Sequence, residues 1–308
     1  MITVVGSGRV GTATAAMLGV MGLDNKIVLI DIMKGLPQGE ALDLNHMASI
    51  LGVDVLYVGS NDYADMKGSD LVIVTAGLPR KPGMTREQLL EQNAQIVWSI
   101  GKDIAKYAPD SVVILTTNPL DAMVYVMWKA TGFSRERVIG FSGVLDGGRL
   151  AFYAAQKLGV SPSSIIPIVL GQHGESMFPV LSKSFIYGVP LDKLLKPEDY
   201  KEVVEETVKA GARITELRGF SSNWAPGAGV AVMAKAVKRD ERRALIASVV
   251  LKGEYGVDGL PVEVPIILGR GGALKVLEIE LSAEEKNKLG QSVEAIRKLI
   301  NSLPDQYK

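Results

Sequence analysis

The stretch Ile2-Thr3-Val4-Val5-Gly6-Ser7-Gly8-Arg9-Val10-Gly11 decides the fold of this chain. A short apolar run typical of a buried strand leads into Gly-x-Gly-x-x-Gly, and a helical pattern follows over residues 10–21. In such a motif the first glycine permits a tight turn, the second lets backbone approach a diphosphate, and the third lets helix and strand pack closely. The helix N-terminus adds unpaired N–H groups and a partial positive charge. The predicted dinucleotide-binding residues here are Gly6, Ser7, Gly8, Arg9, Val10 and Gly11.

An acidic residue follows this motif at the expected distance. Asp31 ends the second apolar run, 20 residues after Gly11. A carboxylate at this place can accept hydrogen bonds from an adenosine ribose, and it would repel a 2′-phosphate. Asp31 therefore favours NAD over NADP, although Lys34 nearby could soften the discrimination, so NADP stays the weaker alternative.

The rest of the N-terminal half alternates short apolar runs with segments of helix length. Continuously apolar runs are typical of strands that are covered on both faces. Strand-helix-strand alternation predicts parallel strands with right-handed crossovers, and therefore an α/β fold with a doubly wound (Rossmann) sheet over residues 1–142. The expected strands are 2–5, 27–31, 53–58, 71–74 and 112–115, and the expected helices include 10–21, 37–49 and 86–107.

After about residue 142 the pattern changes to mixed helices and strands with glycine-rich turns. Residues 143–308 are therefore expected to form a C-terminal α+β domain that carries the substrate and catalytic groups. The expected helices are 146–158, 199–218 and 282–301, and the expected strands are 165–170, 245–252, 262–268 and 274–279.

The composition of the 308 residues excludes several classes of protein. Lys and Arg together number 34, and Asp and Glu together also number 34, so the formal net charge is zero. No broad electrostatic field therefore draws the molecule to nucleic acid or to an anionic membrane. With no cysteine, the chain has no disulfide, thiolate zinc site or thiol nucleophile. The apolar residues 1–23 contain five glycines and follow no basic region, which argues against a signal peptide or membrane anchor. We expect a cytoplasmic protein without a metal.

Two histidines are available for imidazole chemistry, and their contexts differ. His46 lies within the helix expected at 37–49, which favours a structural role or a subunit contact. His173 follows the apolar run 165–170 in a glycine-flanked turn, and sites tend to be built at such strand ends. Because imidazole donates and accepts protons near neutral pH, His173 is the candidate acid and base, with a purely structural histidine as the alternative.

Asp146 and Arg149 open the helix expected at 146–158 and lie three residues apart, so both can face one side of it. An aspartate commonly orients a histidine and stabilises its charged form, while an arginine can hold a carboxylate by a planar two-bond fork. An ordinary surface ion pair is the alternative. Sequence spacing alone does not bring this pair to His173.

Further cations follow the strand at 71–74. Residues 75–86 contain Arg80, Lys81 and Arg86 among prolines and glycines, and they leave the carboxyl end of a strand, where ligands bind in open α/β sheets. This composition suits a loop that closes over an anion and excludes water. A solvated basic loop is the alternative. Asn118 follows the strand at 112–115 and is expected at the same sheet edge.

Together these segments resemble the lactate/malate dehydrogenase family over essentially the whole chain. Their order and separations match jointly, which is more specific than any single motif. The matching positions are 6–11, 31, 76–86, 93, 116–119, 145–149 and 171–176.

The resemblance implies a role for each matching residue. His173 would be protonated to reduce a 2-keto acid and neutral to oxidise the 2-hydroxy acid, and Asp146 would orient it. Arg149 would clamp the substrate carboxylate, Arg86 would act in catalysis by polarising the reacting carbonyl, and Asn118 would hydrogen-bond the substrate. The residues implied to contact NAD outside the glycine motif and Asp31 are Asn93, Thr116, Thr117 and Asn118.

Arg80 carries the expectation about the substrate. In the family the matching position is uncharged in lactate dehydrogenases and Arg in malate dehydrogenases, because only a dicarboxylate needs a second cation. The resemblance therefore implies a small dicarboxylate, malate or oxaloacetate, as substrate. It also implies a homo-oligomer, dimer or tetramer, with helices near 37–49 and 199–218 as contact surfaces. The alternatives are a lactate or other 2-hydroxy-acid dehydrogenase and a non-catalytic dinucleotide sensor.

Two segments depart from the family pattern. Gly147-Gly148 stands where Ser-Ala or Thr-Ala is usual, so the local backbone is expected to differ. Residues 218–226 resemble the wall of the substrate pocket but are one residue longer than usual, which leaves the wall contact unassigned between Ser221 and Ser222.

Overall fold

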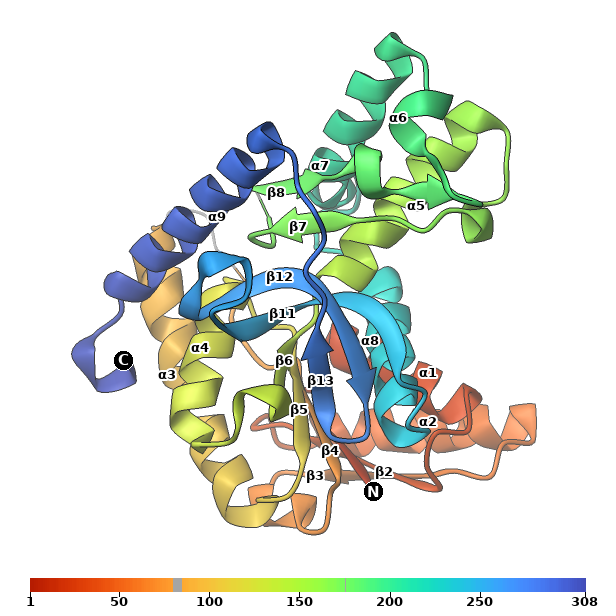
Figure 1. The fold of residues 1–308 in the computed structure, drawn as a ribbon. Helices are drawn as coiled ribbons and strands as arrows, with labels where there is room; N and C mark the ends of the chain where they lie inside the picture. The colour runs from red at the N-terminus through yellow and green to blue at the C-terminus, as the bar shows by residue number, and fades with distance from the viewer. Residues whose placement is uncertain (80–84, 175) are drawn as a thin grey trace.

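The computed structural model describes residues 1–79, 85–174 and 176–308, and it shows a mixed sheet with helices on both faces (Figure 1). The strand order is β3-β2-β1-β4-β5-β6-β11-β12-β7-β8, with β13 paired to β12. Strands β1 to β6 run parallel, whereas β7, β8, β11, β12 and β13 join by antiparallel pairing. The strands are β1 (Ile2–Val5), β2 (Lys26–Ile30), β3 (Leu56–Ser60), β4 (Leu71–Val74), β5 (Val112–Leu115), β6 (Val138–Gly140), β7 (Val169–Gly171), β8 (Met177–Pro179), β11 (Arg243–Lys252), β12 (Asp258–Gly269) and β13 (Gly272–Val276), and the separate hairpin β9 (Phe185–Ile186) and β10 (Val189–Pro190).

Helices cover the parallel strands on both sides. Figure 1 shows α1, α2 and α8 on one side of the sheet and α3 and α4 on the other, with α9 beyond them. This double cover explains why β1, β4 and β5 are buried along their whole length. The α-helices are α1 (Arg9–Val20), α2 (Leu36–Leu51), α3 (Arg86–Tyr107), α4 (Leu120–Thr131), α5 (Gly143–Leu158), α6 (Leu191–Leu194), α7 (Pro197–Arg218), α8 (Trp224–Lys238) and α9 (Ala283–Asn301).

The doubly wound sheet predicted for the N-terminal half is confirmed, with shifts at some element ends. Strand β3 begins at Leu56 instead of the predicted residue 53, because Val53 N–H donates to the carbonyl of Ala48 and closes the end of α2. The left-handed Gly52 permits this helix ending. Helix α4 was not predicted, since most of its residues are buried and apolar and leave little helical periodicity to read.

Some expected elements of the C-terminal half need correction. The strand predicted at 165–170 is confined to Val169–Gly171, because Pro167 lacks an N–H and Ile168 N–H donates to Ser184 Oγ instead. Helix α5 begins at Gly143, so Asp146 lies within its first turns and does not open it. Helix α8 was not predicted from its proline and glycines, yet Gly227 allows it to pack closely on Ala13 of α1.

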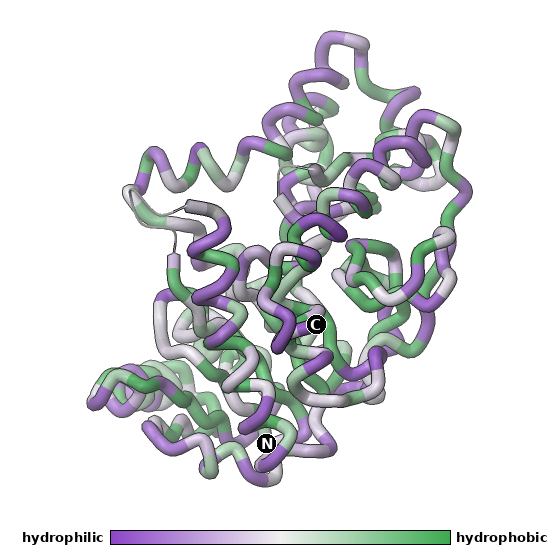
Figure 2. The backbone as a smooth tube through the Cα atoms, turned by 90° about the vertical axis from the view of Figure 1, so that its left-hand side faces the viewer, coloured by the Kyte–Doolittle hydropathy of each residue, from purple (hydrophilic) through white to green (hydrophobic). Residues whose placement is uncertain are grey.

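The strands of the C-terminal half continue the sheet of the N-terminal half. Ser248 of β11 pairs with Gly140 of β6, and Glu263 of β12 pairs with Gly171 of β7. The main apolar core accordingly contains side chains from both halves, while a smaller core lies among α5, α6, α7, β7 and β8. Apolar residues alternate with hydrophilic ones along the outer helices (Figure 2). The division of the chain at residues 142 and 143 stays a prediction.

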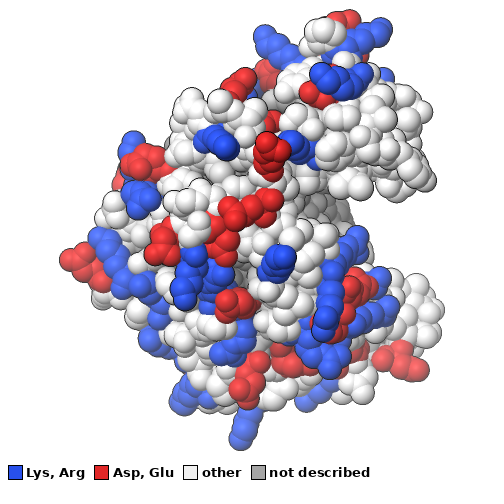
Figure 3. Space-filling model, viewed as in Figure 1, with Lys and Arg blue, Asp and Glu red and all other residues white. Residues whose placement is uncertain are grey.

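The surface agrees with the balanced composition. Lys and Arg side chains are interspersed with Asp and Glu side chains over the face drawn in Figure 3. The same face is hollowed between the part of the molecule that carries α5–α7 and the rest. None of the described helices combines the length and the apolar character needed to cross a membrane.

Candidate active site

The glycine motif has the backbone geometry that close approach of a ligand requires. Gly6 has a φ of +101°, in the left-handed region that favours glycine. A Cβ on Gly11 would lie 1.8 Å from the Gly6 carbonyl oxygen, so only glycine fits where α1 meets the turn. A Cβ on Gly8 would meet nothing within 4 Å, which leaves that side of the loop open. Because Gly8 is the N-cap of α1, no side chain caps the first turn.

Asp31 holds this loop in place. One carboxylate oxygen accepts a hydrogen bond from Ser7 N–H at 2.8 Å, and the other accepts from Met33 N–H at 2.9 Å. The Ser7 hydroxyl is buried without a partner among the described residues. An open N-terminal turn, a fixed carboxylate and an orphaned hydroxyl fit the anionic and hydroxyl groups of a dinucleotide.

Arg9 connects the glycine motif to the C-terminal half. Its guanidinium lies 3.4 Å from the centre of the Phe220 ring, and the Arg218 guanidinium lies 4.3 Å from the same centre. Arg218 also donates to the side-chain oxygen of Asn223 at 2.9 Å. The segment expected to form the substrate wall is therefore packed against the glycine motif, a contact that no sequence motif indicated.

Asn93 ties two of the predicted loops together. Its buried amide accepts from Leu78 N–H at 2.8 Å and donates to the Asn118 carbonyl at 2.7 Å. The Thr117 hydroxyl donates to the Ala76 carbonyl at 2.6 Å. These side chains hold the loops after β4 and β5 side by side. Asn118 is exposed, and the peptide bond that joins it to Pro119 is cis. Direct contact of Asn93, Thr116, Thr117 and Asn118 with cofactor stays a prediction.

The fold brings the predicted histidine and aspartate together. His173 follows β7, and its Nδ1 atom lies 2.7 Å from an Asp146 carboxylate oxygen on α5. The Asp146 side chain is fully buried, and the His173 side chain is 15% exposed. Since Nδ1 is engaged with the carboxylate, Nε2 is the ring atom left to exchange a proton with a ligand.

Asp146 also binds the predicted arginine. Nη1 of Arg149 donates to the second carboxylate oxygen of Asp146 at 3.0 Å, and the Arg149 side chain is 15% exposed. One buried carboxylate thus aligns a proton-transfer group and a cation. His46, by contrast, is exposed on α2.

A second buried aspartate, which was not predicted, is hydrogen-bonded to the backbone of His173. Asp121 of α4 accepts a hydrogen bond from the backbone N–H of His173 at 3.1 Å and one from the Ser248 hydroxyl at 2.6 Å. Burial raises the pKa of Asp121 to about 6, against the opposing effect of Ser248 and His173. Its signal in the sequence was a lone acid in an apolar helix.

The electrostatics keep His173 able to carry a proton. Burial by itself would lower the pKa of His173, but the Asp146 carboxylate and its hydrogen bond outweigh this effect and raise the pKa above its usual value. Asp121 acts in the same direction, and Arg149 opposes it. The imidazole is therefore protonated over a wider pH range than a free histidine.

Two predicted arginines cannot be placed against this group. Arg80 lies outside the described residues, and Arg86 is described only as the first residue of α3, without its side chain. The capping box of Thr85 and Gln88 fixes where that helix starts.

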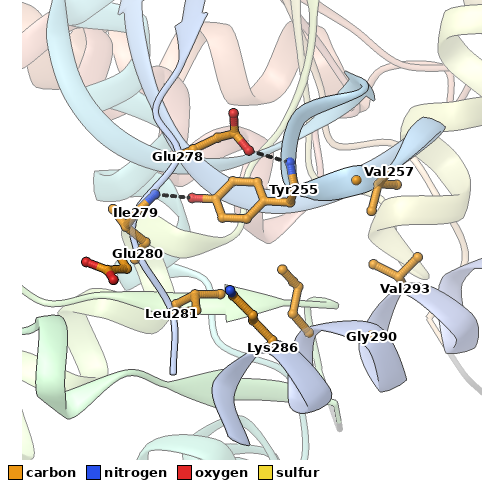
Figure 4. A pocket seen from close by; sticks show the side chains of 11 residues that line it. Tyr255, Val257, Glu278, Ile279, Glu280, Leu281, Lys286, Gly290 and Val293 are labelled. Carbon is orange, nitrogen blue, oxygen red and sulfur yellow. Dashed lines mark hydrogen bonds between the residues drawn. The ribbon is translucent and has the colours of Figure 1, made fainter. Parts of the chain in front are cut away.

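A separate cavity of about 520 Å³ lies between α9 and the end of β13 (Figure 4). Tyr255 crosses it, accepting a hydrogen bond from Ile279 N–H, while Tyr255 N–H donates to Glu278. None of the predicted site residues lines this cavity. The hydrogen-bonded group around His173 is therefore the better candidate for chemistry.

Comparison with known proteins decides the family. Residues 1–140 match the family model described as lactate/malate dehydrogenase, NAD binding domain. Residues 143–306 match the family model described as lactate/malate dehydrogenase, alpha/beta C-terminal domain. The chain belongs to the lactate/malate dehydrogenase family. The family resemblance expected from the sequence is thus confirmed.

Individual relatives of the family match over the full length. The chain is 87% identical to a malate dehydrogenase of Thermoproteus tenax, with all of both chains covered. The solved malate dehydrogenase of Aeropyrum pernix has a TM-score of 0.96 and 54% identity, covering 100% of this chain and 99% of that one. A lactate dehydrogenase of Cryptosporidium parvum, solved with lactic acid and nicotinamide adenine dinucleotide, has a TM-score of 0.93 and 37% identity, covering 97% and 96%.

Proposed function

We propose that the chain is an NAD-dependent malate dehydrogenase, an oxidoreductase that interconverts malate and oxaloacetate. The observation that carries the proposal is Asp146, which is hydrogen-bonded at once to His173 and to Arg149. This arrangement places a proton-transfer group beside a cation that can hold a carboxylate. The relatives named malate dehydrogenase support the choice of substrate.

His173 transfers the proton, and the arginines bind the charged and polar groups of the substrate. In oxidation, neutral His173 accepts the hydroxyl proton of malate at Nε2, and Asp146 stabilises the resulting imidazolium through Nδ1. In reduction, the imidazolium returns that proton to the carbonyl oxygen. Arg149 binds the carboxylate next to the reacting carbon, and Arg86 polarises the carbonyl.

The second carboxylate of the substrate is assigned to Arg80. A 2-hydroxy acid with one carboxylate, such as lactate, would leave this guanidinium unpaired in a closed site. Asn118 adds a hydrogen bond to the substrate from the loop after β5. A lactate-type enzyme is the second candidate, supported by the similar fold of the Cryptosporidium parvum lactate dehydrogenase.

The dinucleotide site belongs to the loop around Gly8. NAD supplies the hydride acceptor for oxidation, and its reduced form supplies the hydride donor. The unpaired N–H groups of α1 would face the diphosphate, and Asp31 would bind the adenosine ribose hydroxyls. The same carboxylate disfavours the 2′-phosphate of NADP.

Further features of the proposal concern its cellular setting. We infer a cytoplasmic enzyme of the tricarboxylic acid cycle that assembles as a dimer or tetramer. Helix α2 exposes Leu42 and Ile50, which are 58% and 84% exposed, and α7 exposes Leu217 at 78%. Apolar side chains on both predicted contact helices support such an assembly.

The test of the proposal is NADH oxidation by the purified protein with a panel of 2-keto acids, repeated with NADPH. We expect oxaloacetate with NADH to give the highest kcat/KM. Preference for pyruvate would favour the lactate-type alternative, and dinucleotide binding without turnover would favour a sensor.

A further inference from the structure

Glu263 lies inside the sheet, close to His173 and Asp146. It belongs to β12, where it pairs with Ser248 of β11 on one side and with Gly171 of β7 on the other. Its side chain is fully buried. One carboxyl oxygen of Glu263, one of Asp146 and a ring nitrogen of His173 all lie within 4.8 Å of one another.

The fold makes room for this carboxyl group. A Cβ on Gly143, at the start of α5, would lie 2.9 Å from Oε1 of Glu263, so a larger residue there would press on it. Neither carboxyl oxygen of Glu263 has a hydrogen-bond partner among the described residues. A buried carboxylate without a partner is very costly, and such groups usually take up a proton instead.

A metal ion would be another way to neutralise this cluster, but the contacts already present argue against it. Nδ1 of His173 and the facing oxygen of Asp146 are 2.7 Å apart, which is the separation of a hydrogen bond and leaves no space for an ion between them. The second Asp146 oxygen is bonded to the Arg149 guanidinium, whose positive charge would repel a cation. A proton fits where a metal does not.

The charges around Glu263 favour its neutral form. Burial raises the pKa of Glu263 well above its usual value, and the nearby Asp146 and Asp121 carboxyls raise it further. The nearby Ser142 hydroxyl and Arg149 offset only part of this rise, and the Ser142 oxygen, like those of Glu263, lacks a partner at hydrogen-bonding geometry among the described residues.

Among the described residues, the other helices that pack on β12 add no further charge. Helices α8 and α9 also contact β12, and their described buried residues include no titratable side chain. His173 is the remaining titratable member of the cluster among the described residues, and it carries a positive charge only while it holds a proton.

We propose that Glu263 is a positioning residue of the Asp146–His173 pair: as a neutral carboxylic acid it fills the space behind the pair and keeps its proton while the imidazole gains and loses one. Asp146 then remains the single ionised carboxylate bonded to the imidazole ring. A second negative charge this close would strengthen imidazolium binding and hinder return of the proton to substrate. The role in catalysis rests on the proposed function, whereas the protonation state does not.

Infrared spectroscopy of the whole protein at neutral pH tests the protonation state directly. A protonated carboxyl group has a carbonyl band that a carboxylate lacks. We expect this band in the wild type, its loss in Glu263→Gln, and its persistence in Asp121→Asn. A wild-type spectrum without the band would overturn the proposal, even if no variant of Glu263 folds.

Stability measured against pH gives a second test. An acid whose folded pKa is raised loses stabilisation as the pH rises from its unfolded value, here 4.5, toward its folded value. The Tm of Glu263→Gln should therefore rise relative to the wild type over that interval. Glu280→Gln, which removes an exposed acid outside the cluster, is the matched control and should follow the wild type. A constant difference between Glu263→Gln and the wild type would overturn the proposal.

The pH dependence of kcat/KM for oxaloacetate then tests the link to His173. If Glu263 is neutral, Glu263→Gln should leave the pKa assigned to His173 within about 0.3 units, because no charge is removed. A fall of about one unit or more would show an ionised Glu263 and contradict the proposal. Inactivity of the wild type toward every 2-keto acid, with the infrared band retained, would contradict the proposed function alone.

Discussion

The Nδ1 atom of His173 lies 2.7 Å from a carboxylate oxygen of Asp146, although the two residues are 27 positions apart in the chain. Asp146 comes from α5 and His173 from the turn after β7, so the pair exists only because this helix packs beside this strand. The carboxylate fixes the orientation of the ring and leaves Nε2 free for proton exchange.

Replacing His173 by Asn should lower kcat by about 10³-fold, within the range typical of a lost general acid or base. The dissociation constant of NADH should change by less than about twofold, since the substitution alters none of the residues of the glycine motif. Stopped-flow turnover and fluorescence titration with NADH measure the two quantities. Turnover near the wild-type rate would rule out His173 as the acid and base.

Arg149→Lys keeps the positive charge but removes the planar fork. We expect KM for oxaloacetate to rise by about 10- to 100-fold, because one ammonium cannot reproduce two parallel hydrogen bonds. Steady-state kinetics at saturating NADH measure this change. Arg213→Lys on α7, where the arginine is 61% exposed, is the matched control and should keep the wild-type KM. Equal KM values for both variants would argue against a carboxylate clamp at Arg149.

Arg80→Gln should shift kcat/KM from oxaloacetate toward pyruvate. Loss of the second cation removes the proposed partner of the distal carboxylate, and it also removes the penalty for leaving a guanidinium unpaired when pyruvate is bound. The two effects together are worth about 3 kcal/mol, so the ratio should change by about a hundredfold or more. The measurement is kcat/KM for both keto acids, and an unchanged ratio would refute the assignment.

Asp31→Ser should increase the use of NADPH relative to NADH by about tenfold, because the charge facing a 2′-phosphate is removed. Asp31 also accepts hydrogen bonds from Ser7 and Met33, so kcat/KM with NADH should fall as well. Asp31→Asn tests charge alone, since its amide oxygen can still accept one of these bonds. If neither variant changes the ratio of the two cofactors, Asp31 does not select against the phosphate.

The ion pair of Arg135 and Glu254 should contribute to stability in a pH-dependent manner. The hydrogen-bonded Arg135 guanidinium lowers the pKa of Glu254 from 4.5 to about 2. An acid with a lowered folded pKa stabilises the protein above its unfolded pKa, and this contribution disappears as the pH falls from 4.5 toward 2.

Glu254→Gln is therefore expected to cost about 1–3 kcal/mol at pH 7, discounted for the partial exposure of both side chains. The cost should shrink toward pH 2. Urea unfolding at several pH values measures it. Glu284→Gln, which breaks a more exposed pair with Lys288, is the control. A cost of Glu254→Gln that does not vary with pH would contradict the prediction.

Many candidate site residues could be predicted because they lie at the ends of strands with strong local patterns. Gly6, Asp31 and His173 each follow a short apolar run and break it with a turn or a charge. The acids Asp121 and Glu263 were missed because each is a lone acid between apolar neighbours, which gives no periodic signal. The structure adds a second role for Asn93, whose amide holds two loops together, and its contact with the cofactor stays a prediction.

The dinucleotide fold could be read from residues 2–31 because it depends on local physics: a strand, a turn that tolerates only glycine, and a helix whose first turn is uncapped. The charges that surround His173 depend on how strands and helices far apart in the sequence pack together. Strands β7, β11 and β12 and helices α4 and α5 bring Asp121, Asp146 and Glu263 to one buried point. The hydrogen bonds and the burial that set their protonation arise only when these distant segments pack together, so tertiary structure alone decided the electrostatics of the site.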